Sequence, residues 1–224
     1  MDQNSVSIAH SQEQIVSTNK VLKNTYMLLS ATLAFSAVTA FVSIGMNMPP
    51  MTYLIALIAS MVLGIFVLPR TANSGAGIGV VFLITGLMGF GLGSVLSMYL
   101  ALPKGPEVIA TAFGGTGIIF LGLSGYALTT KRDFSFMGGF LFAGMMVLVI
   151  AMLANIFFAM PALSLAISAG VILVMSGFIL FDTSRIINGG ETNYIMATYG
   201  LYLSIFNIFI SLLNILMAFA GNDD

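Results

Sequence analysis

The chain has 224 residues, of which 58% are apolar and only 7% are charged, and its mean hydropathy is +1.05. A soluble domain carries about 25% charged residues, so a surface made from this sequence could not stay in water. The formal net charge of −1 provides no basic stripe for nucleic acid. With no cysteine and a single histidine, His10, a disulfide framework and a zinc centre are excluded.

The N-terminal segment is polar. Residues 1–19 lack the apolar core of about 7–15 residues that a cleavable signal peptide needs, so we expect the first membrane helix to drive insertion. Residues 1–25 are expected to form a disordered cytoplasmic tail, residues 26–221 a single transmembrane domain, and residues 222–224 a short external tail.

Uncharged stretches divide the rest of the chain into membrane spans of about 20 residues. Two of them, residues 24–69 and 134–181, are long enough for two spans each and contain prolines near the expected turns, at Pro49 and Pro161. Three shorter stretches supply one span each. The sequence therefore predicts an all-α bundle of seven helices, at 26–46, 52–69, 78–101, 108–129, 136–159, 162–182 and 200–220.

The basic residues predict the orientation of these spans. With the N-terminus inside, six of the seven fall on the cytoplasmic side, and only Lys104 lies outside. The six are Lys20, Lys23, Arg70, Lys131, Arg132 and Arg185. Because cytoplasmic connections are enriched in Lys and Arg, we expect the N-terminus inside and the C-terminus outside.

Small residues recur at helical spacing in two predicted spans, as Gly89-xxx-Gly93-xxx-Ser97 and Gly139-xxx-Ala143. Such patterns let helix backbones approach closely in lipid. They are explained either by packing within one bundle or by the contact face of a homo-oligomer.

Polar groups at membrane depth are the candidate functional residues. Asp182 ends the sixth predicted helix and Asn155 lies in the fifth. The seventh carries small or polar residues at spacings of 4, 3, 4 and 3, which place them on one helix face: Gly200, Ser204, Asn207, Ser211 and Asn214. This face either packs against neighbouring helices or lines a polar cavity or ion path.

Asp182 has two interpretations. Arg185 follows three residues later, so a local ion pair at the membrane interface would account for the carboxylate. A carboxylate deeper in the bundle, paired with Arg70 or Arg185, would instead be a proton-sensitive element.

Intramembrane hydrolysis is not predicted. The spans contain neither a histidine or lysine base nor a second carboxylate beside Asp182, and the His-Glu-x-x-His motif is absent. We therefore expect neither an enzyme nor a bound cofactor or metal, with calcium considered only as a transported ion.

The polar motifs also carry a family resemblance. The segments 181–187, 189–195 and 201–209, which begin Phe-Asp-Thr-Ser-Arg, Gly-Gly-Glu-Thr-Asn and Leu-Tyr-Leu-Ser, resemble the signature of the transmembrane BAX inhibitor motif family. Supporting matches are Gly-Phe-Gly-Leu-Gly at 89–93 and Asn-Ile-Phe at 155–157. The chain is most similar to the bacterial YccA-type branch over nearly its whole length.

The resemblance implies two functions. Bacterial inner-membrane members of this branch are substrates and modulators of FtsH, a membrane-anchored AAA protease that engages their cytoplasmic tail. Other members are pH-sensitive calcium leak channels that use two aspartates on the last two helices and an arginine latch at the end of the second helix. Asp182 matches the first aspartate and Arg70 the latch, but the second aspartate position is Ser204. Since one carboxylate cannot give the coupled titration of a pair, the sequence favours the FtsH modulator, with a cation leak as the alternative.

Overall fold

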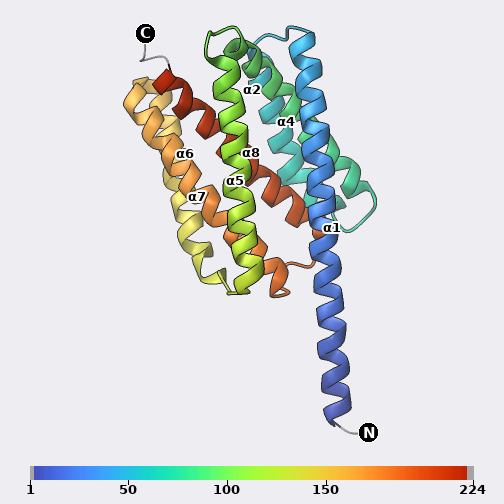
Figure 1. Cartoon of the computed structure of the whole chain (residues 1–224). Helices are drawn as coiled ribbons and strands as arrows, with labels where there is room; N and C mark the ends of the chain where they lie inside the picture. Colours follow the sequence, from blue (N-terminus) through green and yellow to red (C-terminus); the bar gives the residue numbers. More distant parts are fainter. Residues whose placement is uncertain (1–2, 221–224) are drawn as a thin grey trace.

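The computed structural model describes residues 3–220, with side chains described from Thr18 onward. Seven helices of this part are long and apolar enough to span a membrane, and no strand occurs among these residues. The helices are α1 (Gln3–Gly45), α2 (Met51–Val62), α3 (Leu68–Thr71), α4 (Ala76–Leu100), α5 (Gly105–Thr130), α6 (Gly138–Phe158), α7 (Pro161–Ile187) and α8 (Tyr194–Ala220). The α2–α3 segment forms one span, so the predicted bundle of seven spans is confirmed (Figure 1).

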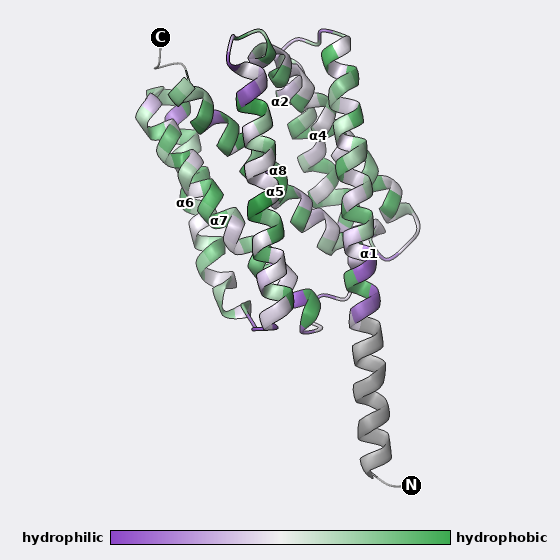
Figure 2. Ribbon diagram, in the orientation of Figure 1, coloured by the Kyte–Doolittle hydropathy of each residue, from purple (hydrophilic) through white to green (hydrophobic). Residues whose placement is uncertain are grey.

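The connections alternate between the two ends of the bundle. Those after α3, α5 and α7 lie at the same end as the start of α1, and α8 finishes at the opposite end (Figure 1). Hydrophobic colours run along the helices, whereas hydrophilic ones gather at their ends (Figure 2). All basic residues except Lys104 therefore lie at one end of the bundle, as expected for spans that cross the membrane in alternating directions. That this end is the cytoplasmic one stays a prediction.

α1 continues beyond the membrane span. It runs for 43 residues, about 65 Å at 1.5 Å per residue, whereas the hydrocarbon core of a bilayer is about 30 Å thick. The membrane-length part is Thr18–Gly45. The predicted disordered tail at 1–25 thus overlaps the start of this helix, but residues 1–2 and the side chains of residues 3–17 lie outside the described residues, as do residues 221–224. Disorder of the tail stays a prediction.

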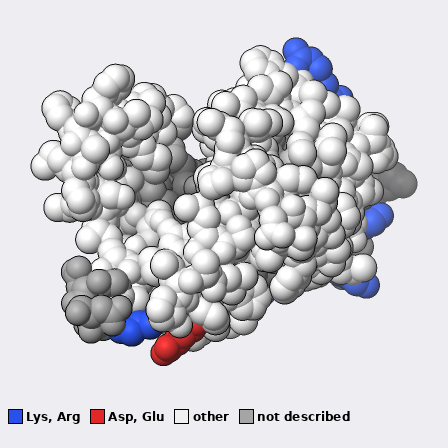
Figure 3. All heavy atoms as spheres, turned by 90° about the horizontal axis from the view of Figure 1, so that it is seen from above, with Lys and Arg blue, Asp and Glu red and all other residues white. Residues whose placement is uncertain are grey.

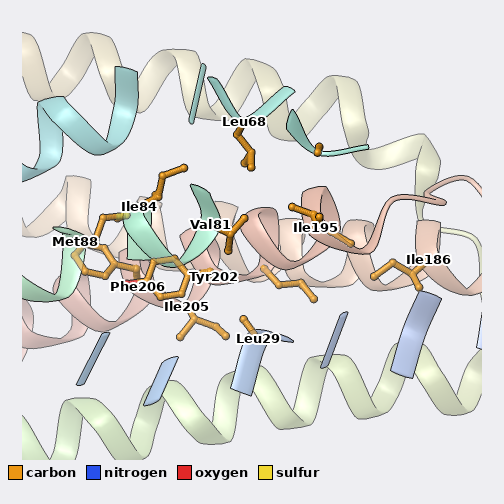
Figure 4. Close-up of a cluster of buried hydrophobic side chains, with 13 residues drawn as sticks. Leu29, Leu68, Val81, Ile84, Met88, Ile186, Ile195, Tyr202, Ile205 and Phe206 are labelled. Carbon is orange, nitrogen blue, oxygen red and sulfur yellow. The ribbon is translucent and has the colours of Figure 1, made fainter. Parts of the chain in front are cut away.

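α8 lies at the centre of the bundle, packed against α7, α5, α1 and α4. α2 packs on the outer side of α4, and α6 packs on the outer side of α7. The largest core cluster joins α1, α3, α4, α7 and α8 (Figure 4). The side chains labelled there are Leu29, Leu68, Val81, Ile84, Met88, Ile186, Ile195, Tyr202, Ile205 and Phe206.

α1 and α4 meet along a seam of glycines. A Cβ atom added at Gly89 would overlap the carbonyl oxygen of Ser36, and one added at Gly93 would overlap that of Ala40. Only glycine lets the two backbones come this close. In lipid, where apolar burial does not drive helices together, this close packing is the main source of attraction between them. The Gly89 pattern is therefore used within the bundle, whereas a Cβ at Gly139 on α6 would meet nothing within 4 Å.

A buried hydrogen-bond network connects the same two helices to α8. The hydroxyls of Ser36 and Tyr202 are 2.7 Å apart, and the Tyr202 hydroxyl donates to the carbonyl oxygen of Thr85 at 3.2 Å. Tyr202 is only 1% exposed, so its hydroxyl would be costly to bury without these partners. The network fixes the rotation of α8 against the α1–α4 pair.

The second span changes pitch before α3. Residues Leu63–Val67 form a π-helix, and Pro69 follows it. A proline cannot donate to the carbonyl four residues earlier, and its ring clashes with that carbonyl, here that of Ile65. The wider turn relieves this clash and brings the backbone at Gly64 against the hydroxyl of Tyr199 on α8.

The glycine seam predicts a contrast between two substitutions on α4. Gly89→Ala should lower the free energy of unfolding by about 1–3 kcal/mol, because the new methyl group meets backbone that cannot rotate away. Gly79→Ala, where a Cβ would meet nothing within 4 Å, should be neutral or stabilising. Thermal unfolding of both purified variants in detergent measures the difference, and equal midpoints would contradict the seam.

Candidate functional site

Asp182 lies inside α7 rather than at its end. The sequence predicted helices ending at 182 and beginning at 200, but α7 continues to Ile187 and α8 begins at Tyr194. Both predicted ends were wrong: the charge of Asp182 was taken as the end of its helix, and the start at 200 passed over the cap at Asn193. Thr183, Ser184 and Ile186 are buried, so packing extends the helix past the carboxylate. Asp182 is therefore about 7.5 Å from the end of α7, at 1.5 Å per residue.

The carboxylate of Asp182 faces α8 at Gly200. A Cβ atom placed on Gly200 would lie 2.9 Å from Oδ2 of Asp182, so the missing side chain makes room for the carboxylate. Asp182 is half-buried, and no hydrogen bond or ion pair joins it to any residue in the described part of the chain. A partly desolvated carboxylate without a direct hydrogen bond is costly to keep charged, which makes Asp182 the polar group of the spans whose setting calls for explanation.

Neither arginine forms the predicted pair with Asp182. Arg185 extends along α7 to the α7–α8 connection, where its guanidinium donates to the carbonyl oxygen of Gly190 at 3.1 Å and pairs with Glu191 at 3.5 Å. Its guanidinium lies over the ring of Phe181, with 5.4 Å between the guanidinium carbon and the ring centroid. The Arg185 side chain therefore runs toward the end of the bundle, where its charge reaches water.

Arg70 folds back on its own helix. Its guanidinium donates to the carbonyl oxygen of Phe66 in the π-helical segment. A latch role for Arg70 stays a prediction, because no contact among the described residues joins it to Asp182.

The polar face of α8 is largely satisfied by packing and by its own helix. Ser204 and Ser211 are buried, and the Ser204 hydroxyl donates to the carbonyl oxygen of Gly200 at 3.2 Å. The Asn207 amide donates to the carbonyl oxygen of Leu203 at 2.8 Å. Among the side chains of this polar face, only that of Asn214 forms a hydrogen bond to another helix: its Oδ1 accepts from the Tyr99 hydroxyl of α4 at 3.1 Å. An ion path along this face stays a prediction.

Asn155 belongs to a different part of the molecule. Its Oδ1 accepts a hydrogen bond from the backbone N–H of Met160 at 3.1 Å, closing the turn between α6 and α7. Ala159 in this turn has a φ of 48°, a left-handed conformation that ends the helix. This turn lies at the opposite end of the bundle from Asp182, so the two residues are not brought together.

Sequence reasoning missed Asn193, which joins two connections at the Asp182 end of the bundle. Its Oδ1 accepts from the backbone N–H groups of Ile195 at 2.9 Å and Met196 at 3.1 Å, capping the start of α8. Its Nδ2 donates to the carbonyl oxygen of Ala72 at 3.0 Å and to Oδ1 of Asn73 at 2.8 Å. An asparagine before an apolar run is a helix-start signal, but the predicted start at 200 was too late to use it.

The two ends of the bundle differ in charge. Seen from the end where α8 finishes, the surface is mostly uncharged, with a hollow between the α6–α7 pair and the α1, α2 and α4 group (Figure 3). At the other end, the α5–α6 connection carries Lys131, Arg132 and Asp133. The Ser135 backbone donates to Asp133 at 2.8 Å, and hydrogen bonds from Ser135 hold the pKa of this exposed carboxyl below its usual range.

Comparison with known proteins places this arrangement in a family. A family model described as "Inhibitor of apoptosis-promoting Bax1" matches residues 18–221. The chain is 51% identical over 218 residues to "Modulator of FtsH protease YccA" of Escherichia coli strain K12, covering 97% of this chain and 98% of that protein. It is also 51% identical over 213 residues to an uncharacterized membrane protein of Vibrio cholerae, covering 95% and 96%. An uncharacterized protein of Pseudomonas aeruginosa shares 51% identity over 205 residues, 91% of each chain.

The contacts of Asn193 predict separate effects of the cap and of the bridge between connections. Asn193→Ser keeps a capping oxygen but cannot reach Ala72 and Asn73, whereas Asn193→Ala loses both functions. Loss of the cap should cost about 1 kcal/mol, so the thermal midpoints should fall in the order wild type, Asn193→Ser, Asn193→Ala. Equal midpoints for the serine variant and the wild type would show that the bridge contributes nothing to stability.

Proposed function

The chain belongs to the BAX inhibitor family, and we propose from this that it is an inner-membrane modulator and substrate of the membrane AAA protease FtsH. The observation that carries the proposal is the 51% identity to the YccA modulator over 97% of the chain. A second relative with the same identity is named "Inner membrane protein YccA". The match spans all seven membrane helices, so it is not confined to one shared segment.

The structure supports this proposal through the continuity of α1. The polar N-terminal residues pass into the first membrane span within one helix, with no intervening loop among residues 3–45. Force applied to the tail by a cytoplasmic ATPase would act along the axis of α1. α1 is held at its far half by the seam with α4 and by the Ser36–Tyr202 bond. Extraction would therefore begin at α1. Its removal would break the seam with α4 and the bond to Tyr202, on which the core of the bundle depends.

The proposed role is not catalytic, and it requires no resident cofactor. Its support is the description of the relative as a modulator, together with the lack of a hydrolytic set in the sequence. Within residues 18–220, no group of three or more His, Cys, Asp or Glu side chains is placed to hold a metal ion.

The tail provides the test of the FtsH proposal. Deleting residues 2–19 should leave the bundle folded and lengthen its half-life severalfold in cells that contain FtsH, because the ATPase loses the segment it grips. Pulse–chase measurement of the full-length and deleted proteins gives the comparison. In cells without FtsH the two half-lives should coincide, and removal of residues 222–224 is the matched control at the other end. An unchanged half-life of the tail deletion in FtsH-containing cells would contradict the proposal.

A cation leak is the second candidate, and the position of Asp182 favours it. The carboxylate lies against Gly200 without an ion pair among the described residues, where a permeating cation would be attracted. Against this, the residue one turn along from Gly200 is Ser204, which is buried and bonded to its own helix. A second carboxylate is missing there, so we rank the leak below the modulator.

Calcium flux into liposomes separates the two candidates. The purified wild type should show little pH-gated flux, and Ser204→Asp should increase it by supplying the second carboxylate near Asp182. Ser211→Asp is the matched control, since Ser211 is also buried on this face but lies about 10 Å farther along α8. Robust flux in the wild type that Asp182→Asn abolishes would reverse the ranking.

A further inference from the structure

Three methionines stand close together where α1 passes into α2. Met46, Met48 and Met51 fall within six consecutive residues, and nowhere else in the sequence do three of the 16 methionines come so close. This connection lies at the end of the bundle where α8 finishes, the end predicted to face outward (Figure 1). Three thioether groups are therefore concentrated in one turn at the surface.

Hydrogen bonds fix the backbone of this turn on both sides. Asn47 ends α1 with a φ of 50°, a left-handed conformation, and the backbone N–H of Met48 donates to the carbonyl oxygen of Ser43 at 3.3 Å. On the other side, the backbone N–H of Thr52 donates to the carbonyl oxygen of Pro49 at 2.9 Å and starts α2. The proline pair between these bonds restricts the backbone further. Ligands carried on such a turn lose little conformational freedom when they bind.

The spacing of the three residues keeps their sulfur atoms within reach of a common point. Even a fully extended chain would separate the Cα atoms of Met46 and Met48 by only about 7 Å, and those of Met48 and Met51 by about 11 Å. Met46 is 57% exposed and Met51 is 61% exposed, whereas Met48 is half-buried. Because a methionine side chain has three rotatable bonds, the two exposed side chains can turn toward Met48 without disturbing the core.

The chemistry of the turn selects the kind of ion. Residues 24–69 contain no charged residue, histidine or cysteine, so the turn offers no side-chain ligand set for zinc or calcium. A thioether is a ligand of another class: it is soft and neutral, and it favours Cu(I) over hard divalent cations. Other exposed methionines, such as Met27, Met61 and Met152, lie on three different helices and serve only as apolar surface.

We propose that Met46, Met48 and Met51 form a surface site for a soft monovalent metal ion, Cu(I), at the outer end of the bundle. The three sulfur atoms would share the ion, and the capped, proline-containing turn would hold their backbone in place. The site is separate from Asp182, which lies toward the opposite end of the bundle, and it does not depend on the proposed relation to FtsH.

Competition with a coloured Cu(I) chelator tests the site on the purified full-length protein in detergent, without oxygen. The wild type should take one Cu(I) from the chelator. Replacing Met46, Met48 and Met51 together by leucine should weaken binding about tenfold or more, since loss of even supporting groups costs a metal site that much. Leucine keeps the apolar volume, so the thermal midpoint without metal should not change. The matched control replaces Met27, Met61 and Met152 by leucine and should bind as the wild type does.

Silver(I), which has the same preference for thioethers, shows where the ion binds. In protein labelled with 13C at the methionine methyl groups, Ag(I) should shift the NMR signals of Met46, Met48 and Met51 and leave that of Met61 in place. Millimolar calcium should not displace it, because calcium binds oxygen ligands. The proposal is overturned if the wild type takes up no Cu(I), if the two triple variants bind alike, or if calcium displaces the silver.

Discussion

The close approach of α1 and α4 is the constraint on which the rest of the bundle depends. Lipid offers helices no gain from burying apolar surface against one another, so their association rests on dispersion contacts and on hydrogen bonds. Gly89 and Gly93 let the α4 backbone touch the carbonyl groups of Ser36 and Ala40, which maximises those contacts. Tyr202 then bonds to both helices of this pair, so α8 can occupy the centre in only one rotation. The positions of α5 and α7 follow, because both pack on α8.

The same use of glycine creates the environment of Asp182. With α8 fixed in its rotation, Gly200 is turned toward α7 and leaves space for one carboxylate. Arg185 does not enter that space, because Glu191 and the Gly190 carbonyl bind it at the end of the helix. Two acidic residues nine positions apart thus have different partners. The carboxylate of Asp182 packs against Gly200, whose missing side chain leaves room for it, whereas Glu191 pairs with Arg185. The space at Gly200 explains how a single partly desolvated carboxylate persists in a packed membrane bundle.

The number of spans could be predicted from the sequence because apolar length alone decides it in a bilayer. The end of α7 could not, since the helix is extended past residue 182 by buried neighbours of Asp182 that a hydropathy pattern does not reveal. Asn193 was recognisable as a helix cap, but its bridge to Ala72 joins residues 121 positions apart and depends on the finished fold. The partner of Arg185 was likewise set by the direction of its side chain toward water rather than by its spacing from Asp182.

These contacts suggest how being a substrate and being a modulator are related in the proposed function. The strongest attachments of α1, at Ser36 and Ala40, lie in the half of its span farthest from the tail. Nearer the tail, α1 is held by the bond from the Thr198 hydroxyl to the carbonyl oxygen of Thr25. A protease that pulls on the tail must therefore move the whole span before the glycine seam opens. In the proposed function, the dispersion contacts along the seam would have to break together, so extraction would be slow and the substrate would keep the protease occupied. Slow release of the first helix is thus a physical route by which a substrate limits the activity of its own protease.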